Sequence, residues 1–152
     1  MDAPITPQEF EAFSAVRRAV LLLQASSGRA LVENGDITRA QFEILFVLGQ
    51  HPEGLRMHEL ADLLIISRSG LTYQIGRLER GGLVARSTAQ DNERAVVARL
   101  TGVGRERVEE LQQRHFAFIR RHFFGPMNDE EIAVITRLFT RIGDGLEAER
   151  DT

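Results

Sequence analysis

The feature that most constrains this chain is a change of hydrophobic period within residues 56–101. Up to Arg80, apolar residues recur every three or four positions, which is typical of helices that bury one face. From Leu83 onward, apolar and polar residues alternate, which is typical of strands. The glycine pair Gly81-Gly82 separates the two patterns and would end a helix. The segment therefore predicts two short helices joined by a tight turn and followed by a hairpin.

The second of these helices, expected over Ser67–Arg80, is amphipathic. Ser67 is a favourable N-cap, and Leu71, Ile75 and Leu78 recur at the spacing of a buried helix face. At about 100° per residue, the opposite face is polar. That face carries Ser69, Thr72, Tyr73, Gly76, Arg77 and Arg80. It suits contact with a polar partner, although many such faces are only solvated.

The hairpin is expected from two strands, Leu83–Ser87 and Ala95–Leu100. Alternation puts Val96, Ala98 and Leu100 on one face of the second strand, with Val97 and Arg99 on the other. The connection between the strands is polar and ends in Arg94. An arginine at such a tip can enter a narrow, electronegative groove, or it can simply be solvated.

The length of 152 residues favours one domain over residues 1–152, built around one cooperative core. No run of eighteen apolar residues is present, and the first residues lack the pattern of a signal peptide, so we expect a cytoplasmic protein without membrane association. The absence of cysteine excludes disulfides, thiolate zinc sites and a cysteine nucleophile.

Charge is sorted along the chain. The net charge of −3 argues mildly against nucleic acid, but residues 68–107 hold eight arginines against four acidic residues. Residues 128–152 hold seven acidic residues against three arginines. All nineteen basic residues are arginine, whose planar fork suits phosphates and guanine edges.

Long helices are expected on both sides of the central segment. Capping motifs at Thr6, Thr38 and Asn128 mark three helix starts, and another helix should run from Thr101 to Phe124. The first helix should reach about residue 32, with a possible kink at residues 26–28.

The long helices carry apolar stripes at three- and four-residue spacing, which usually seek a partner helix. The stripe residues are Phe10, Phe13, Val16, Val20, Leu23, Leu31, Val108, Leu111, His115, Phe118, His122, Ile132, Ile135, Phe139, Ile142 and Leu146. A small central module could not cover them all. We therefore expect a homodimer interface formed by both ends of the chain, with an intramolecular core as the alternative.

Four strings of residues, in this order and spacing, carry a family resemblance. They are Met57-His58-Glu59-Leu60-Ala61-Asp62-Leu63-Leu64, Ser67-Arg68-Ser69-Gly70-Leu71-Thr72, Arg77-Leu78-Glu79-Arg80-Gly81-Gly82-Leu83-Val84, and Asn92-Glu93-Arg94 followed by Leu100-Thr101. Over nearly its whole length the chain resembles the MarR family of bacterial transcriptional regulators. The resemblance implies a mainly α fold with a small two- to three-stranded β wing, that is, a winged helix-turn-helix with long N- and C-terminal dimerisation helices.

The resemblance also implies a function. Residues 37–101 would form the DNA-binding lobe, and residues 6–33 and 102–149 the helical dimerisation region. A homodimer would place one recognition helix per subunit in successive major grooves of a pseudo-palindromic operator on double-stranded DNA. Each wing arginine would enter the flanking minor groove. The residues expected to contact DNA are Arg56, Ser67, Arg68, Ser69, Thr72, Tyr73, Gln74, Arg77, Arg86 and Arg94.

The wing departs from the family pattern at one position. The family's wing usually has Asp-x-Arg before the second strand, and Asn92 stands where that Asp would be. In the family this acid pairs with an arginine and steadies the wing. Asn92 cannot form an ion pair, so Asp91 or Glu93 would have to pair with Arg77 or Arg80 instead.

Members of the family are most often repressors that respond to a small aromatic or phenolic ligand. The expected effector site lies between the dimerisation helices and the DNA-binding lobe. It would be lined by Phe13, Arg17, Phe42, Phe46, His51 and Phe116. Arg17 or Arg18 could pair with the ligand's carboxylate, and no cofactor is expected.

Other functional classes have weaker support. The chain lacks a Gly-x-Ser-x-Gly elbow, a phosphate-binding loop and a His-Glu-x-x-His helix, so we expect no enzyme. His115 and His122 lie about 10 Å apart along one helix, too far to share a metal ion, whereas His51 and His58 could converge. No metal site is expected. A metal-responsive regulator and a winged-helix module that binds a protein remain as alternatives.

Overall fold

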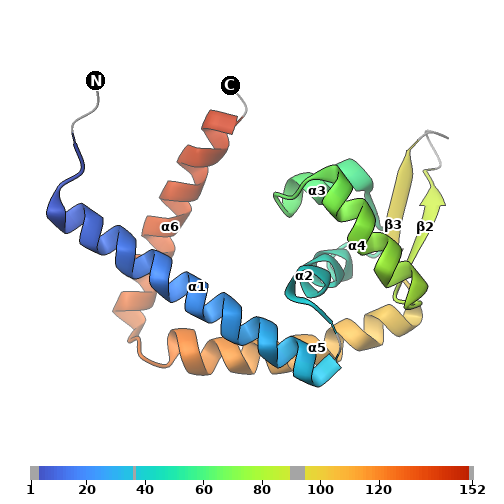
Figure 1. Cartoon of the computed structure of the whole chain (residues 1–152), viewed down its shortest axis with the longest axis horizontal. Helices are drawn as coiled ribbons and strands as arrows, with labels where there is room; N and C mark the ends of the chain where they lie inside the picture. The colour runs from blue at the N-terminus through green and yellow to red at the C-terminus, as the bar shows by residue number, and fades with distance from the viewer. Residues whose placement is uncertain (1–3, 36, 90–94, 151–152) are drawn as a thin grey trace. The chain divides into compact units, whose positions relative to one another are not determined.

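The computed structural model describes residues 4–35, 37–89 and 95–150 (Figure 1). The elements in these ranges are α1 (Pro7–Gly35), α2 (Arg39–Gly49), β1 (Leu55–Arg56), α3 (Met57–Leu63), α4 (Arg68–Arg80), β2 (Val84–Thr88), β3 (Val96–Leu100), α5 (Gly102–Ile119), the π-helical turn η1 (Arg120–Phe124) and α6 (Asp129–Arg150). The chain divides into two compact units, residues 1–115 and residues 116–152.

The helix starts follow the capping motifs of the sequence. At the start of α2, the Thr38 side chain accepts from the backbone N–H of Gln41, and the Gln41 side chain accepts from Thr38 N–H at 3.0 Å. Asn128 and Glu131 exchange the same pair of bonds before α6, at 2.8 and 2.9 Å. These bonds satisfy amides that a helix start otherwise leaves without partners. The expected helix α1 is also found, and it continues through residues 26–28.

The core of the first unit is built around α2. Its Ile44, Leu45 and Leu48 are fully buried and belong to one apolar cluster with residues of α3, α4, β2, β3 and α5. The inward face expected for α4 is confirmed, because Leu71, Ile75 and Leu78 are all buried in this cluster. Burial of this stripe fixes which face of α4 remains exposed.

The sheet has three antiparallel strands in the order β1-β3-β2. The hairpin strands pair from Val84 opposite Leu100 to Thr88 opposite Val96. The two-residue strand β1 adds to the other edge of β3. Val96, Ala98 and Leu100 lie at alternate positions of β3 in a regular register, as predicted. Ala98 and Leu100 are buried, whereas Val96 is 42% exposed because its pair with Thr88 ends the ladder away from the buried pair Val84–Leu100.

A close backbone contact joins α5 to the start of the wing. The Thr101 side chain donates to the carbonyl oxygen of Gly82 at 2.7 Å and accepts from Gly104 N–H at 2.9 Å. Thr101 N–H also donates to the carbonyl oxygen of Leu83 at 3.1 Å. A Cβ on Gly104 would lie 1.9 Å from that same oxygen. Only glycine fits there, since 1.9 Å is far inside van der Waals contact.

The turn between α3 and α4 contains a left-handed isoleucine. Ile65 has φ +53° and is 73% exposed. A β-branched side chain rarely adopts this conformation, because its Cβ crowds the backbone. The turn is held by two backbone bonds, from Ile65 N–H to Asp62 O and from Ile66 N–H to Ala61 O. They set the chain direction that leads into Ser67 and α4.

In the second unit, the helix expected to run unbroken to Phe124 changes to π geometry over Arg120–Phe124. Gly125 follows at the point where a Cβ would lie 2.4 Å from the Arg121 carbonyl oxygen. Along α6, the large apolar residues Val134, Phe139, Ile142 and Leu146 are exposed. Among the described residues, no helix combines the length and apolar character needed to cross a membrane.

Candidate nucleic-acid interface

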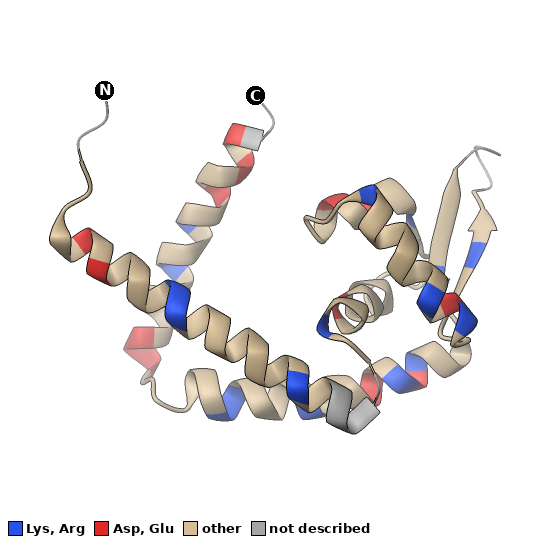
Figure 2. Cartoon of the chain, in the orientation of Figure 1, with Lys and Arg blue, Asp and Glu red and all other residues tan. Residues whose placement is uncertain are grey.

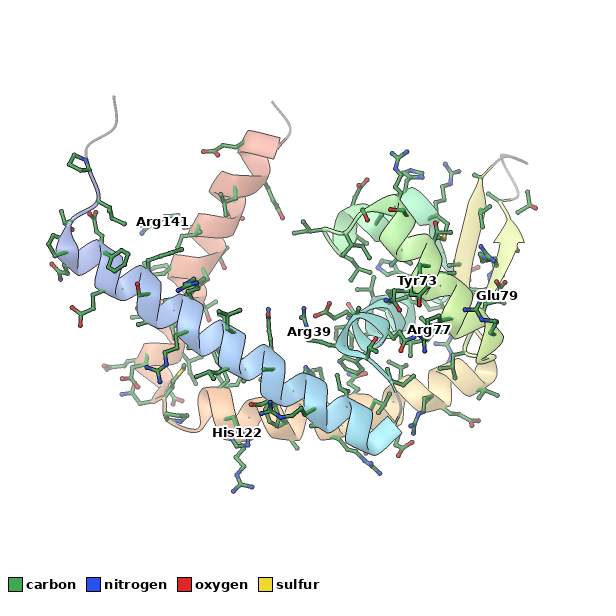
Figure 3. All side chains as sticks on the ribbon, viewed as in Figure 1. Arg39, Tyr73, Arg77, Glu79, His122 and Arg141 are labelled. Atoms are coloured by element: carbon green, nitrogen blue, oxygen red, sulfur yellow. The ribbon has the colours of Figure 1, made fainter. Side chains whose placement is uncertain are left out.

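The outward face of α4 is polar and accessible, as the sequence predicts. Ser69, Thr72 and Arg77 are exposed, and Tyr73 is 60% exposed. Figure 3 shows Tyr73 and Arg77 on this helix. Arginines lie on α4 and on the neighbouring strand β2, whereas acidic residues mark both ends of α6 (Figure 2). The exposed face therefore combines hydroxyl groups with positive charge.

Hydrogen bonds within the start of α4 decide what its hydroxyl groups offer. The Ser67 side chain accepts from Gly70 N–H at 3.1 Å and lies 3.3 Å from the Ser69 hydroxyl. The Thr72 hydroxyl donates to the carbonyl oxygen of Arg68 at 2.8 Å. Thr72 was expected to contact DNA, and this bond occupies its hydroxyl proton. It presents a methyl group and acceptor lone pairs instead.

Gln74 was also expected to contact DNA. Its side chain is half-buried, and its amide oxygen is enclosed without a hydrogen-bond partner among the described residues. A buried acceptor without a partner is unfavourable by about 1–3 kcal/mol. That oxygen is therefore not presented on the exposed face of α4, because its position lies beside the buried stripe.

Arg86, expected to contact DNA, forms an ion pair within the lobe. Its guanidinium donates to Glu79 Oε2 from Nε at 3.0 Å and from a terminal nitrogen at 2.5 Å. This bond from Arg86 lowers the pKa of Glu79, and the Glu79 carboxylate in turn raises the pKa of Arg86. The pair joins β2 to the end of α4. Because both side chains are partly exposed, its contribution to stability is small.

A cavity of about 310 Å³ lies beside α4 and brings three of the expected DNA contacts together. These three are Arg56, Arg68 and Thr72. The remaining lining residues are Met57, His58, Ala95 and Val96, which sequence reasoning did not select. His58 could have been selected from the sequence, because it lies two residues after Arg56, an expected DNA contact. Arg94 and Asn92, with Asp91 and Glu93, lie outside the described residues.

The residues expected to bind an effector are dispersed over several environments. Phe42 is buried in the core, with its ring centroid 6.0 Å from that of Phe46. Phe13 and Arg17 are exposed on α1, and His51 is exposed in the turn after α2. Phe116 lines a separate cavity of about 520 Å³ within the second unit. The proposed ligand site thus remains a prediction.

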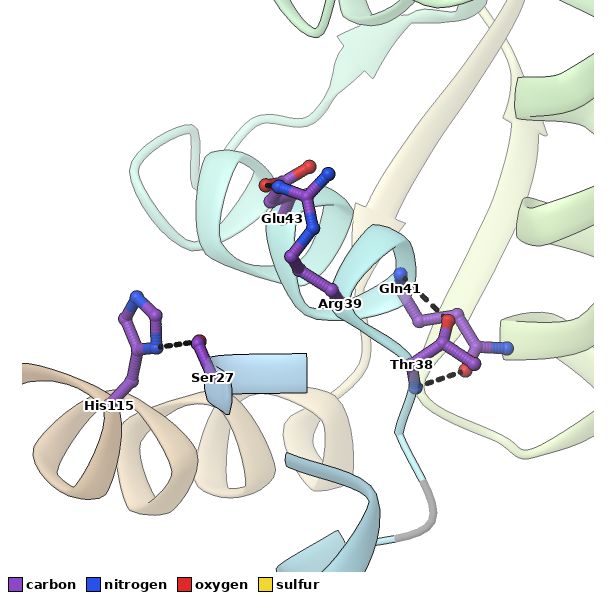
Figure 4. Close-up of polar contacts among 6 residues, drawn as sticks. All are labelled: Ser27, Thr38, Arg39, Gln41, Glu43 and His115. Carbon is purple, nitrogen blue, oxygen red and sulfur yellow. Dashed lines mark hydrogen bonds and ion pairs between the residues drawn. The ribbon is translucent and has the colours of Figure 1, made fainter. Parts of the chain in front are cut away.

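His115, which the sequence places on an apolar stripe, contacts side chains of α1 and α2, and Figure 4 shows its contact with Ser27 of α1. His115 Nδ1 on α5 lies 3.1 Å from the hydroxyl of Ser27, a buried residue of α1. Its ring centroid is 4.7 Å from that of Phe42 on α2. Burial lowers the pKa of His115, and the charge of Glu43 opposes this shift. Arg39 forms an ion pair with Glu43.

We expect stability to fall as pH decreases below the ordinary pKa of histidine, about 6.5. Below that pH the unfolded chain takes up a proton at His115 more readily than the folded chain, whose pKa is lower. The loss therefore begins near the ordinary pKa and stops below the folded pKa. Urea denaturation of the wild type and of His115→Asn between pH 5 and 8 measures it.

The slope of unfolding free energy against pH should be smaller in His115→Asn than in the wild type. His51→Asn, in the exposed turn after α2, is the matched control and should keep the wild-type slope. Equal slopes in the wild type and His115→Asn would show that His115 is not the group responsible.

No group of three potential metal ligands that could hold an ion occurs among the described residues.

The chain is similar in sequence and in structure to known proteins. A family model described as MarR family matches residues 35–95. AbsC, a MarR family transcriptional regulator from Streptomyces coelicolor, superimposes with a TM-score of 0.88 and 29% identity, covering 97% of this chain and 99% of AbsC. Both similarities are to the MarR family of transcriptional regulators.

Two further similarities agree with these two. Sco3205, a MarR family transcriptional regulator from Streptomyces coelicolor solved in complex with DNA, superimposes with a TM-score of 0.91 and 25% identity, covering 96% of this chain and 92% of Sco3205. YkoM, an HTH-type transcriptional regulator of Bacillus subtilis, is 29% identical over 99 residues. That match spans 65% of this chain and 62% of YkoM. The fold is the winged helix of MarR proteins, whose members are transcriptional regulators and not enzymes.

Proposed function

We propose that this protein is a homodimeric, sequence-specific DNA-binding transcriptional regulator. The observation that carries the proposal is the exposed polar face of α4, flanked by a cationic cavity and a hairpin. A helix of this kind fits the major groove, where each base pair presents a distinct pattern of donors and acceptors. The complex of Sco3205 with DNA supports the same role here.

The face offers two kinds of contact. Tyr73 and Arg77 project from the middle and end of α4, where they would reach base edges or phosphates. Ser67 and Ser69 lie at its start, near the first amides of the helix, which favour a phosphate oxygen. The Glu79–Arg86 pair would hold the wing beside the helix, so that the hairpin reaches the neighbouring groove.

Dimerisation is supported by apolar surface on the long helices. Exposed large apolar residues are Phe10, Phe13, Val16, Val20, Leu21 and Leu22 on α1, and Val134, Phe139, Ile142 and Leu146 on α6. Soluble monomers rarely leave so many large apolar side chains of one helix in water, and here both helices do so. A second copy would cover these faces and place two α4 helices about one helical turn of DNA apart.

Repression relieved by an aromatic or phenolic ligand is the finer form of the proposal. It rests on the family resemblance. A ligand bound among the helices would change the spacing of the two α4 helices and so their fit to half-sites. Binding to the operator would place the protein in the bacterial cytoplasm.

An electrophoretic mobility shift with the DNA upstream of its own gene tests the function. Binding should weaken at least about a thousandfold between ~50 and ~200 mM salt, because cationic contacts release counterions from DNA. Tyr73→Ala should lower operator affinity roughly tenfold, and Arg94→Ala should also weaken binding. Arg141→Ala, on α6, is the matched control and should bind like the wild type.

A folded protein that binds no promoter fragment would overturn the proposal. In that case, the exposed face of α4 would serve a protein partner. A pull-down with the wild type and Tyr73→Ala would then compare capture by the same face.

A further inference from the structure

We propose that the cavity beside α4 holds one sugar–phosphate unit of the DNA backbone, with Arg68 and His58 donating hydrogen bonds to the phosphate. The proposal rests on the proposed function, since it names the part of the DNA that this site would take. The cavity has a volume of about 310 Å³. That is room for one such unit but not for a longer stretch of duplex.

Three parts of the lobe form the cavity. The β1–α3 junction contributes Arg56, Met57 and His58; α4 contributes Arg68 and Thr72; and the β3 side of the hairpin contributes Ala95 and Val96. No single sequence motif contains this set. It exists only because β1 pairs with β3, which brings the start of α3 to the hairpin.

The lining selects an anion. Two arginines and a histidine line the cavity, and none of the lining residues that the structure describes is acidic. Arg68 is cationic at every physiological pH, and His58 has an N–H donor in both protonation states. A phosphate oxygen accepts several hydrogen bonds at once, and such charge-assisted bonds are the strong ones.

The rest of the lining favours a sugar over a base edge. Met57, Ala95 and Val96 are apolar, and Val96 is 42% exposed at the end of its strand. The Thr72 hydroxyl proton is already donated to Arg68 O, so that Thr72 presents its methyl group and lone pairs. Reading a base edge requires matched donors and acceptors. Apolar groups beside cations match a deoxyribose ring beside its phosphate.

The position of the cavity agrees with this ligand. Thr72 belongs to the exposed face of α4, and Val96 belongs to the hairpin, so the cavity lies between the two elements proposed to enter adjacent grooves. One backbone strand of a duplex always separates its major groove from the neighbouring minor groove. That strand must cross between α4 and the hairpin, where the cavity lies.

Fluorescence anisotropy with the operator duplex and a scrambled duplex, over a series of salt concentrations, tests the proposal. Arg68→Ala and His58→Ala should each weaken binding to both duplexes roughly tenfold, with the ratio of the two affinities unchanged. Arg68→Ala should also reduce the slope of log affinity against log salt by about one. Val96→Trp should fill the cavity and weaken binding to both duplexes without changing charge.

Arg141→Ala, which removes an equal charge from α6, should leave both affinities as in the wild type. Thermal unfolding checks that each variant folds; if Val96→Trp does not, the two polar variants decide the matter. If Arg68→Ala and His58→Ala both bind the two duplexes as tightly as the wild type does, this inference is overturned and the proposed function is left intact. A changed affinity ratio would assign the cavity to a base edge. No binding by the wild type would overturn both proposals.

Discussion

Gly104→Ala should lower the free energy of unfolding by about 3 kcal/mol or more, because the new methyl group has nowhere to go. Its Cβ would meet the Leu83 carbonyl oxygen at 1.9 Å and the carbonyl carbon at 2.8 Å. Both atoms belong to the backbone, so no side-chain rotation can relieve the clash. The start of α5 would have to move away and lose the Thr101 bonds to Gly82 and Leu83.

Urea denaturation followed by circular dichroism measures this loss. Gly102→Ala is the matched control, since a Cβ there meets nothing within 4 Å. Alanine at that position should leave stability unchanged or raise it by about 0.5 kcal/mol, because it restricts the unfolded chain. If Gly104→Ala were as stable as the wild type, the packing of α5 against Leu83 would be disproved.

Changing two apolar residues of α6 to glutamate should break the proposed dimer. Ile142 and Leu146 are exposed on the same stripe of the helix. Each side chain is already nearly half-buried, so burying the rest of it would stabilise a dimer by about 0.75–1.5 kcal/mol. A homodimer holds four such side chains, so the double variant Ile142→Glu, Leu146→Glu should raise the dissociation constant about 10²- to 10⁴-fold. Charge buried against the partner would add to this loss.

Sedimentation equilibrium measures the dissociation constant directly. Thr140→Glu adds a charge at an exposed polar position of the same helix and should leave the dimer intact. The double variant should also lose operator affinity, since two linked α4 helices bind better than one. A wild type that is monomeric at micromolar concentration, or a double variant that stays dimeric, would disprove this interface.

Sequence reasoning placed correctly the elements whose determining residues are close together in the sequence. The buried stripe of α4 follows from the spacing of Leu71, Ile75 and Leu78, and the helix starts follow from capping residues. In each case the deciding residues lie within a few positions of one another. The first strand of the hairpin, predicted over Leu83–Ser87, is observed one residue later, over Val84–Thr88.

The features that sequence reasoning missed depend on distant neighbours. Strand β1 has two residues, too few to show a period, and exists only through its pairing with β3. Gln74 lies at the border of the α4 faces, where burial is decided by tertiary packing. The bond between Ser27 and His115 spans 88 positions. The cavity likewise gathers residues from three separate segments, and no periodicity connects them.

The wing is anchored at both edges, and this has a mechanical consequence. On one side β3 pairs with β1, immediately before α3; on the other, Arg86 of β2 binds Glu79 near the end of α4. Moving the hairpin relative to these helices would break the pairing of β3 with β1 or the ion pair between Arg86 and Glu79. In the proposed complex, helix and hairpin would therefore approach or leave DNA together, and the separation between the two lobes of the dimer would be the variable left for control.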